Sequence, residues 1–398
     1  MFIYLAFLVV YCLLSFGAVL PQNWLAVEMF WVAGILGLAI RRILKDQKLD
    51  LIGGLLWAAS ALLVFFVAPK FGVGVTAVGW AGLAARQSES RTLRFFHFLL
   101  GIGFLEALLG LVQFFVLPGW ILGYEGINRS SGTLINRNHF AGILEMLIPV
   151  AFGLGYLAFR RHRDISRSYL YIFIGAFMGV ALVFSLSKMG IFSFLMTLIL
   201  LSALMSVRSG LPRLASILGL GLLGLVFVGA LWIGIDVVVE RYADLFKKDA
   251  LVEEGRTIVF RDTLQLIKAN PLGVGIGRYV DVFRQFQTYH TESLFDHAHN
   301  DYLETTAEWG IPIAVLFWTV IAWVVLRSVR ALLSSESIEK RAVLLACIGS
   351  ICSILLHSFT DFNLQIPSNA MLFFTFLGIA FAYSRRSRNL LTPTIRVD

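Results

Sequence analysis

The chain has 398 residues, of which 58% are hydrophobic and 15% are charged, and its formal net charge is +8. Because a soluble domain carries about 25% charged residues, this composition excludes a soluble enzyme and indicates an integral membrane protein. The positive charge does not indicate nucleic-acid binding, since the basic residues lie in short loops between apolar segments.

Twelve apolar segments are predicted to be transmembrane helices, because a helix that spans the bilayer takes about 20 apolar residues. They cover residues 2–20, 24–40, 51–68, 71–85, 95–117, 139–159, 169–186, 189–207, 213–236, 312–330, 342–359 and 366–384. The first segment has no preceding basic residues and no small-residue cleavage site, so we expect a retained helix. The fold class is therefore an all-α integral membrane protein.

Every second loop between these segments is basic, which predicts that these loops and both termini face the cytoplasm. The other side of the membrane then holds a medium loop (118–138), a long loop (237–311) and a connection near residues 357–366. We expect three regions: helices 1–9 in 1–236, the large outer loop in 237–311, and helices 10–12 with a cytoplasmic tail in 312–398.

The large outer loop is predicted to contain short amphipathic helices. Residues 255–268 have helical periodicity, and Asn270-Pro271 ends that helix. A turn with glycine at every second position follows, and it is not a dinucleotide fingerprint because it lacks the preceding strand and the spacing. A second helix is expected near 279–287, and a third is expected to begin near His297 or His299 and to end at Gly310.

The polar residues of the chain are concentrated between positions 296 and 308, which hold two histidines, two aspartates, an asparagine, a tyrosine and two glutamates. We expect the chemistry of the protein there, on the non-cytoplasmic side. ATP and sugar nucleotides are absent from that side, so a donor must arrive already activated, and a lipid carrier is the natural choice.

Four segments resemble the O-antigen ligase and polymerase superfamily in order and in position. They are Gly132–Gly142, Asn270–Gly277, His299–Gly310 and His357–Pro367. The resemblance covers the chain from about residue 100 onward, and the predicted layout of twelve helices with one large periplasmic loop is similar as well.

This resemblance implies a glycosyltransferase at the periplasmic face of the bacterial inner membrane. Its donor would be an undecaprenyl-diphosphate-linked glycan, and its acceptor would be lipid A-core, a growing glycan or a protein. The resemblance implies an inverting reaction without a metal or a cofactor. The order of the motifs favours a ligase that uses lipid A-core, and the alternative is a repeat-unit polymerase.

Three residues are catalytic candidates. His299 matches the loop histidine of the family and suits a general base, although a packing role would also explain it. Arg256 resembles the loop arginine of the family and would stabilise the leaving diphosphate, unless it only contacts lipid phosphate. Lys188 lies where family members have arginine, so it keeps the charge but loses the two-pronged hydrogen bonding.

The substrate-binding candidates in the large loop are Arg261, His297, Asn300 and Glu304. Arg261 is a second candidate for the diphosphate. His297 could replace His299 as the base or bind a metal with it, but the spacing does not place both rings on one helix face and no third ligand is evident. Asn300 and Glu304 could orient the substrate or could cap and brace a helix.

Further substrate-binding candidates lie outside the large loop. Arg137, Asn138 and His139 begin the sixth span, where they could contact a ligand or cap the helix. His357 and Asp361 lie between the last two spans and could belong to the site or form a buried pair. Glu106, within the fifth span, is a functional candidate because ionisable residues are rare inside the membrane.

A polytopic lipid or polysaccharide transporter is the alternative from another class. Transporters place polar residues near the bilayer midplane and are often built from internal repeats. Here the polar residues gather on one outer face and no repeat is evident, so the sequence favours the enzyme. A purely structural scaffold would leave the clustered histidines unexplained.

Overall fold

The structure is a computed structural model. It describes residues 2–15, 17, 27, 81–82, 85, 88–117, 120–121, 124–125, 130–209, 255–288 and 296–385. The predicted spans at 24–40, 51–68, 71–85 and 213–236 lie wholly or largely outside the described residues.

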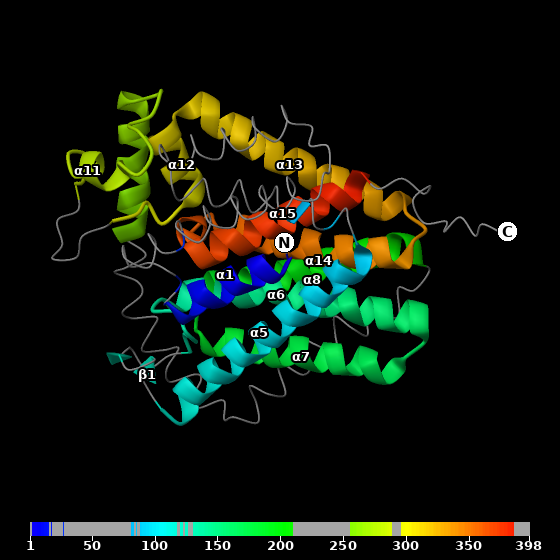
Figure 1. Ribbon diagram of the computed structural model, residues 1–398. Coiled ribbons are helices and arrows are strands. Elements are labelled where there is room, and N and C mark those ends of the chain that lie inside the picture. The colour runs from blue at the N-terminus through cyan, green and yellow to red at the C-terminus, as the bar shows by residue number, and fades with distance from the viewer. Residues whose placement is uncertain are drawn as a thin grey trace, which may run out of the picture.

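The described chain is helical apart from one short antiparallel ladder, and its long helices lie side by side (Figure 1). The ladder pairs β1 (Trp120–Ile121) with β2 (Tyr124–Glu125). The helical elements are α1 (Phe2–Leu14), α5 (Glu89–Phe115), α6 (Arg137–Leu157) with its π-helical extension η2 (Ala158–His162), α7 (Ile165–Phe184), α8 (Lys188–Ser209), a helix over 255–269, α11 (Tyr279–Phe283), α12 (Asp301–Trp309), α13 (Ile311–Ser334), α14 (Ile338–His357), η3 (Asn363–Gln365) and α15 (Pro367–Arg385).

Five of the described helices are long and apolar enough to cross a membrane: Glu89–Phe115, Arg137–Arg161, Ile165–Phe184, Lys188–Ser206 and Ile311–Ser334. They coincide with the predicted spans at 95–117, 139–159, 169–186, 189–207 and 312–330. The helices α14 and α15 occupy the predicted spans at 342–359 and 366–384, and α1 occupies the start of the first. The prediction of an all-α integral membrane protein is confirmed for this part of the chain.

Helix α6 forms the centre of the bundle and packs against α5, α7, α8, α14 and α15. The apolar stretch of α6 is buried along its whole length. Small residues permit the close approach of α6 to α14, as expected for helices packed in a membrane. A Cβ on Gly153 would lie 2.5 Å from the carbonyl oxygen of Ala342, and one on Gly349 would lie 2.7 Å from Pro149.

The 255–269 helix, α11 and α12 form a small group at one end of the bundle (Figure 1). Its apolar core is separate from the main core and consists of Val259, Leu266, Ile267, Tyr279, Phe283, Ala298 and Ala307. The predicted amphipathic helix therefore buries part of its apolar face against the protein, while Leu264 on the same helix is 46% exposed. The second predicted loop helix is shorter than expected and ends at Phe283.

The glycine-rich turn after Asn270 packs against the junction of α12 and α13. Gly273 and Gly310 both have positive φ, at +88° and +80°, and a Cβ on either would lie 2.5 Å or less from the backbone of the opposite segment. The amide of Val274 donates to the carbonyl of Ala307 at 2.9 Å, and that of Ile311 donates to Pro271 at 2.9 Å. The glycines thus serve a tight backbone contact.

Glu106, for which the sequence offers no partner, holds the loop before α6. Its carboxylate accepts hydrogen bonds from the amide of Thr133 at 2.9 Å and from the Thr133 hydroxyl at 2.8 Å. Gln113, two turns further along α5, accepts from the amides of Ser131 and Gly132. All of these groups are buried. They fix the loop that leads into the first turn of α6.

Glu106→Ala is expected to lower the free energy of unfolding by about 2 kcal/mol or more, because two buried donors of Thr133 lose their acceptor. Thermal unfolding of the purified protein in detergent measures the effect. Leu105→Ala is the matched control, since Leu105 is 60% exposed on the same helix. An unchanged melting temperature for Glu106→Ala would contradict this role.

Candidate functional site

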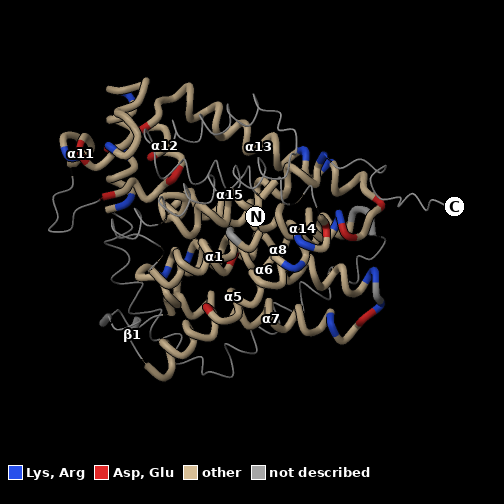
Figure 2. The backbone as a smooth tube through the Cα atoms, viewed as in Figure 1, with Lys and Arg blue, Asp and Glu red and all other residues tan. Residues whose placement is uncertain are grey.

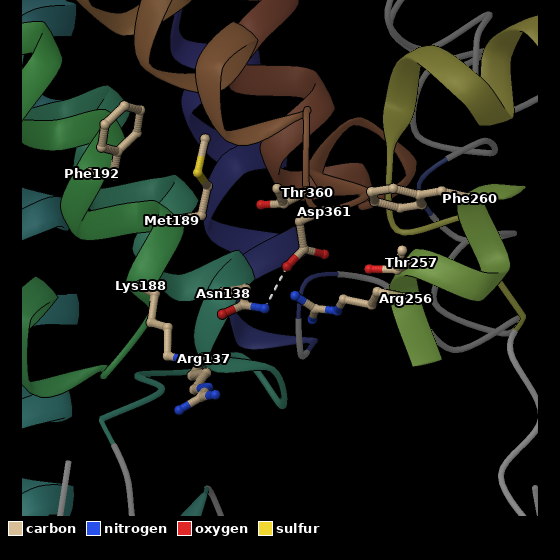
Figure 3. Close-up of a pocket in the computed structure, with 10 residues that line it drawn as sticks. All are labelled: Arg137, Asn138, Lys188, Met189, Phe192, Arg256, Thr257, Phe260, Thr360 and Asp361. Atoms are coloured by element: carbon tan, nitrogen blue, oxygen red, sulfur yellow. Dashed lines mark hydrogen bonds between the residues drawn. The ribbon is translucent and has the colours of Figure 1, made fainter. Parts of the chain in front are cut away.

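A pocket of about 490 Å³ opens where four segments meet: the starts of α6 and α8, the start of the 255–269 helix, and the connection between α14 and α15 (Figure 3). It is lined by Arg137, Asn138, Lys188, Met189, Phe192, Arg256, Thr257, Phe260, Thr360 and Asp361. Five of the predicted site residues therefore share one pocket, although they are spread over more than 200 positions of sequence.

Three cationic side chains line this pocket, and they come from three different elements: Arg137, Lys188 and Arg256. In Figure 3, Lys188 extends toward Arg137, and Arg256 reaches across from the opposite side toward Asn138 and Asp361. The Nε atom of Arg256 is buried and has no hydrogen-bond partner among the described residues. Asp361 is the one carboxylate among the described lining residues, so the pocket suits an anion.

Two helix N-termini add to this positive potential. Asn136 caps α6 by accepting a hydrogen bond from the amide of Asn138 at 2.9 Å, which places Arg137 in the first turn. Helix α8 begins at Lys188, and the hydroxyl of Ser187 accepts from the amide of Gly190 at 3.2 Å. Because the N-terminus of a helix carries partial positive charge, both ends favour a phosphate-like ligand.

Asp361 connects the pocket to the histidines. Its carboxylate accepts hydrogen bonds from the side chain of Asn138 and, at 2.8 Å, from the amide of Phe362. The nearest ring nitrogens of His139 and His299 lie 3.8 and 3.9 Å from its Oδ1. Burial alone would raise the pKa of Asp361, but His139, His357 and Arg256 together hold that pKa well below its usual range. Asp361 is therefore ionised.

Phe362 brings three predicted histidines together, and nothing in the sequence pattern indicated its role. Its ring stacks on His297 with 4.1 Å between centroids. His139 and His299 meet the same ring edge-on, at 4.8 and 4.9 Å. One aromatic side chain thus fixes imidazoles from α6 and from the segment before α12.

His299 has properties that suit a proton acceptor. Its pKa is lowered to about 4, mainly by burial; the neighbouring Arg256 and His297 act in the same direction, and Asp361 offsets part of this. The imidazole is therefore neutral near pH 7. His299 also has a φ of 49°, a conformation that costs free energy in a residue other than glycine and that concentrates at functional sites.

The residues that follow His299 attach α12 to the connection between α14 and α15. Asn300 caps α12 through the amide of Leu303 at 3.0 Å and donates to the carbonyl of Phe359 at 2.8 Å. Asp301 accepts from the hydroxyl of Ser358 at 2.6 Å. The Tyr302 hydroxyl donates to the carbonyl of Leu355 at 2.6 Å. Part of the polar cluster at positions 296–308 therefore holds α12 in place.

Glu304 braces the segment that carries the histidines. Its carboxylate lies 2.7 Å from Nδ1 of His297 and accepts the amide of Ala298 at 2.8 Å. For Asn300 and Glu304 the structure thus provides the capping and bracing contacts that the sequence left as one of two interpretations. In the described part of the chain, no three His, Cys, Asp or Glu side chains are grouped so that they could hold a metal ion.

The sequence left open whether His357 and Asp361 form a buried pair or belong to the site, and the structure gives His357 another partner. His357 bonds instead to Glu145 of α6, with 2.9 Å between Nδ1 and Oε1, and both side chains are fully buried. The cause is the direction of α14, which points His357 at α6, whereas Asp361 lies one turn later in the connection and faces Asn138. Arg261 also differs from expectation, since it lies outside the pocket lining and donates to Thr288 at 2.8 Å.

Residues 173–318 match the family model described as O-antigen ligase. This match supports a relationship of the chain to the O-antigen ligase and polymerase superfamily. A comparison with curated proteins finds no match.

The matched O-antigen ligase family implies a glycosyltransferase-like enzyme of a bacterial membrane whose substrates are lipid-linked glycans. The matched segment contains the catalytic candidates Lys188, Arg256 and His299. The residues of the other pocket wall, Arg137 and Asp361, lie outside it. The O-antigen ligase segment therefore supplies only part of the pocket, and α6 and the α14–α15 connection complete it.

Proposed function

We propose that this protein transfers a glycan from an undecaprenyl-diphosphate carrier to a hydroxyl of lipid A-core, as an O-antigen ligase, at the periplasmic face of the bacterial inner membrane. The observation that carries this proposal is the convergence of Arg137, Lys188 and Arg256 on one pocket, beside a neutral histidine that faces an ionised carboxylate.

The donor binds with its diphosphate among the three cations. An arginine guanidinium can donate hydrogen bonds to two phosphate oxygens at once, and lysine adds a point charge. Met189 and Phe192 of α8 and Phe260 of the 255–269 helix supply apolar surface on opposite sides of the pocket (Figure 3). This apolar surface suits the first isoprene units of the carrier, which must lie next to the diphosphate.

The reaction is a single displacement that inverts the anomeric carbon. The acceptor hydroxyl attacks that carbon, and its proton passes to the neutral imidazole of His299. The bond between the anomeric carbon and the phosphate oxygen breaks, and the diphosphate leaves with the electron pair. Arg256, Arg137 and Lys188 stabilise its growing charge, so the step uses no metal. Asp361 orients His299 and stabilises the imidazolium that forms.

Donor binding tunes the base. In the free protein the cation of Arg256 helps to keep the pKa of His299 low. A diphosphate beside Arg256 adds negative charge, and negative charge raises the pKa of a nearby histidine. The imidazole thus becomes a stronger base when the donor is in place.

The other candidates have supporting roles. His297, His139 and His357 position the surrounding elements, and Asn138, Asn300 and Glu304 act in the same way. Arg261 contacts more distant parts of the donor.

The pH dependence tests this tuning. The acid limb of kcat/KM reports the free enzyme, so we expect its midpoint near the lowered pKa of His299, about 4, rather than near 6.5. The acid limb of kcat reports the complex with donor and should lie at higher pH. Initial rates of glycan transfer between pH 3.5 and 8, on the scale of these pKa values, measure both. Coincident limbs near 6.5 would contradict the assignment.

The proposed topology has twelve transmembrane helices, both termini in the cytoplasm, and residues 237–311 as a periplasmic loop domain between the regions 1–236 and 312–398. The placement of the described basic residues supports it. Figure 2 shows Lys and Arg gathered at the end of the bundle where α13 ends and α14 begins, and Arg161 is paired there with Glu339 in the first turn of α14. Cytoplasmic loops carry such an excess of arginine and lysine.

A deletion strain tests the proposed activity. Lipopolysaccharide and undecaprenyl-linked glycan are extracted and separated on gels. We expect long polymer to accumulate on the carrier while lipid A-core stays bare. Lipid A-core that bears single repeat units would instead indicate a polymerase, and normal lipopolysaccharide would show that lipid A-core is not the acceptor. Complementation with the wild-type gene must restore the normal pattern.

A further inference from the structure

A second pocket, of about 360 Å³, lies where α13 ends, α14 begins and α15 ends. The pocket that contains Arg256 and Asp361 is called the glycan-transfer pocket below. Its Asp361 follows the last turn of α14, whereas Lys340 of the second pocket lies in the first turn of α14. The two pockets are therefore separated by the length of a 20-residue helix, or about 30 Å. Figure 2 shows Lys and Arg gathered at this end of α13.

The second pocket is basic and aromatic. Arg327, Arg330 and Lys340 line it together with Trp323. The guanidinium of Arg327 lies over the Trp323 ring at 5.6 Å. Its Nε atom is buried and has no hydrogen-bond partner among the described residues, so part of its donor capacity is available to a ligand.

Further contacts extend this basic surface onto α15. The Trp323 ring packs against Phe381 with 5.9 Å between centroids, and the guanidinium of Arg385 lies over Phe381 at 5.4 Å. The serine hydroxyls of Ser334 and Ser384 also line the pocket. Aromatic rings with arginine against their faces are common at the water interface of membrane helices.

No carboxylate belongs to the described lining of this pocket. Glu339 lies nearby on α14, but its carboxylate is paired with Arg161 at 2.7 Å and accepts from Ser337 at 3.0 Å. Because no acidic residue is part of this described lining, an anionic ligand would meet little repulsion inside the pocket.

An apolar surface begins beside the cations. Leu326 lines the pocket and is 58% exposed, and Trp323 and Val320, about one and two turns earlier on α13, are 49% and 48% exposed. Since α13 is long and apolar enough to cross a membrane, we expect this strip to face the hydrocarbon. A ligand with a phosphate head and acyl chains matches both the basic pocket and the apolar strip beside it, whereas a free phosphate matches only the basic pocket.

We propose that this pocket binds the phosphate headgroup of an anionic phospholipid from the leaflet opposite the glycan-transfer site. Arg327, Arg330 and Lys340 contact the phosphate oxygens, and the acyl chains lie along Leu326 and Val320. Basic pockets between transmembrane helices bind such headgroups. The inference rests on the placement of the protein in a membrane and not on the proposed transferase activity.

Native mass spectrometry of the delipidated full-length protein tests the proposal. The protein is titrated with cardiolipin, phosphatidylglycerol or phosphatidylethanolamine, and in a separate arm with inorganic phosphate. We expect the two anionic lipids to bind and phosphatidylethanolamine to bind at least tenfold more weakly, since each basic contact contributes about fivefold. Equal binding of the zwitterionic lipid, or displacement of cardiolipin by excess inorganic phosphate, would overturn the proposal.

The variant R327Q/R330Q is expected to weaken cardiolipin binding by about 25-fold. The matched control is R91Q/R94Q, which removes two exposed arginines at the same end of the bundle, outside the pocket, and should bind as the wild type does. The single variant R330Q removes an exposed side chain, so it should fold even if the double variant does not. An unchanged affinity of R330Q, where about a fivefold loss is expected, would refute the assignment.

Discussion

His299→Ala is expected to reduce glycan transfer by two to four orders of magnitude, the usual contribution of a positioned general base. The imidazole is neutral because burial lowers its pKa, and it lies 3.9 Å from the ionised Asp361. With the base removed, the acceptor hydroxyl has no group to take its proton. Transfer rates of the purified variant, at saturating donor, measure the loss.

The positive φ of His299 allows a sharper test. Asparagine tolerates this backbone conformation better than most residues, so His299→Asn keeps the turn before α12 while it removes the base. We expect it to fold as the wild type does, with the same thermal unfolding, and to be as inactive as His299→Ala. A His299→Asn protein with near wild-type transfer would exclude His299 as the base.

Arg256→Ala is expected to lower kcat by two to three orders of magnitude, in line with the loss of one preorganised donor to a developing anion. The side chain lies in the pocket opposite Lys188 and Arg137, and its Nε atom lacks a partner in the described chain (Figure 3). Because the diphosphate gains charge as it leaves, kcat should fall more than donor affinity does. Steady-state kinetics over a range of donor concentrations separate the two.

Two further variants control for this experiment. Arg256→Lys keeps the charge but not the two-pronged hydrogen bonds, so it should recover part of the rate. Lys268→Ala removes an exposed cation from the same helix, outside the pocket, and should leave transfer unchanged. If Arg256→Ala and Lys268→Ala lose activity equally, the loss reflects surface charge rather than a contact with the leaving group.

The membrane helices and the loop helices were predictable because their signals are local. Apolar runs located α6, α7, α8 and α13 within a few residues. The periodicity of 255–268 predicted a helix that the structure extends over 255–269. Arg137 and Lys188 could be selected because they lie beside predicted spans, and Arg256 because it resembles the loop arginine of the family. All three line one pocket.

The contacts between these elements could not be read from the sequence, because the partners are far apart along the chain. Asn138 and Asp361 are separated by 223 positions, and Glu145 and His357 by 212. Sequence proximity suggested a pair between His357 and Asp361, but helix direction decides which side chains meet. Phe362 carries no charge, so nothing marked it as the ring that joins three histidines.

Reconstitution with purified components tests the central claim most directly. The full-length protein in detergent or vesicles is mixed with undecaprenyl-diphosphate-linked glycan and lipid A-core in the presence of a metal chelator. We predict glycosylated lipid A-core and released undecaprenyl diphosphate in equal amounts, and neither product with His299→Asn or Arg256→Ala. Absence of transfer by the wild-type protein, or transfer that the two variants retain, would contradict the account.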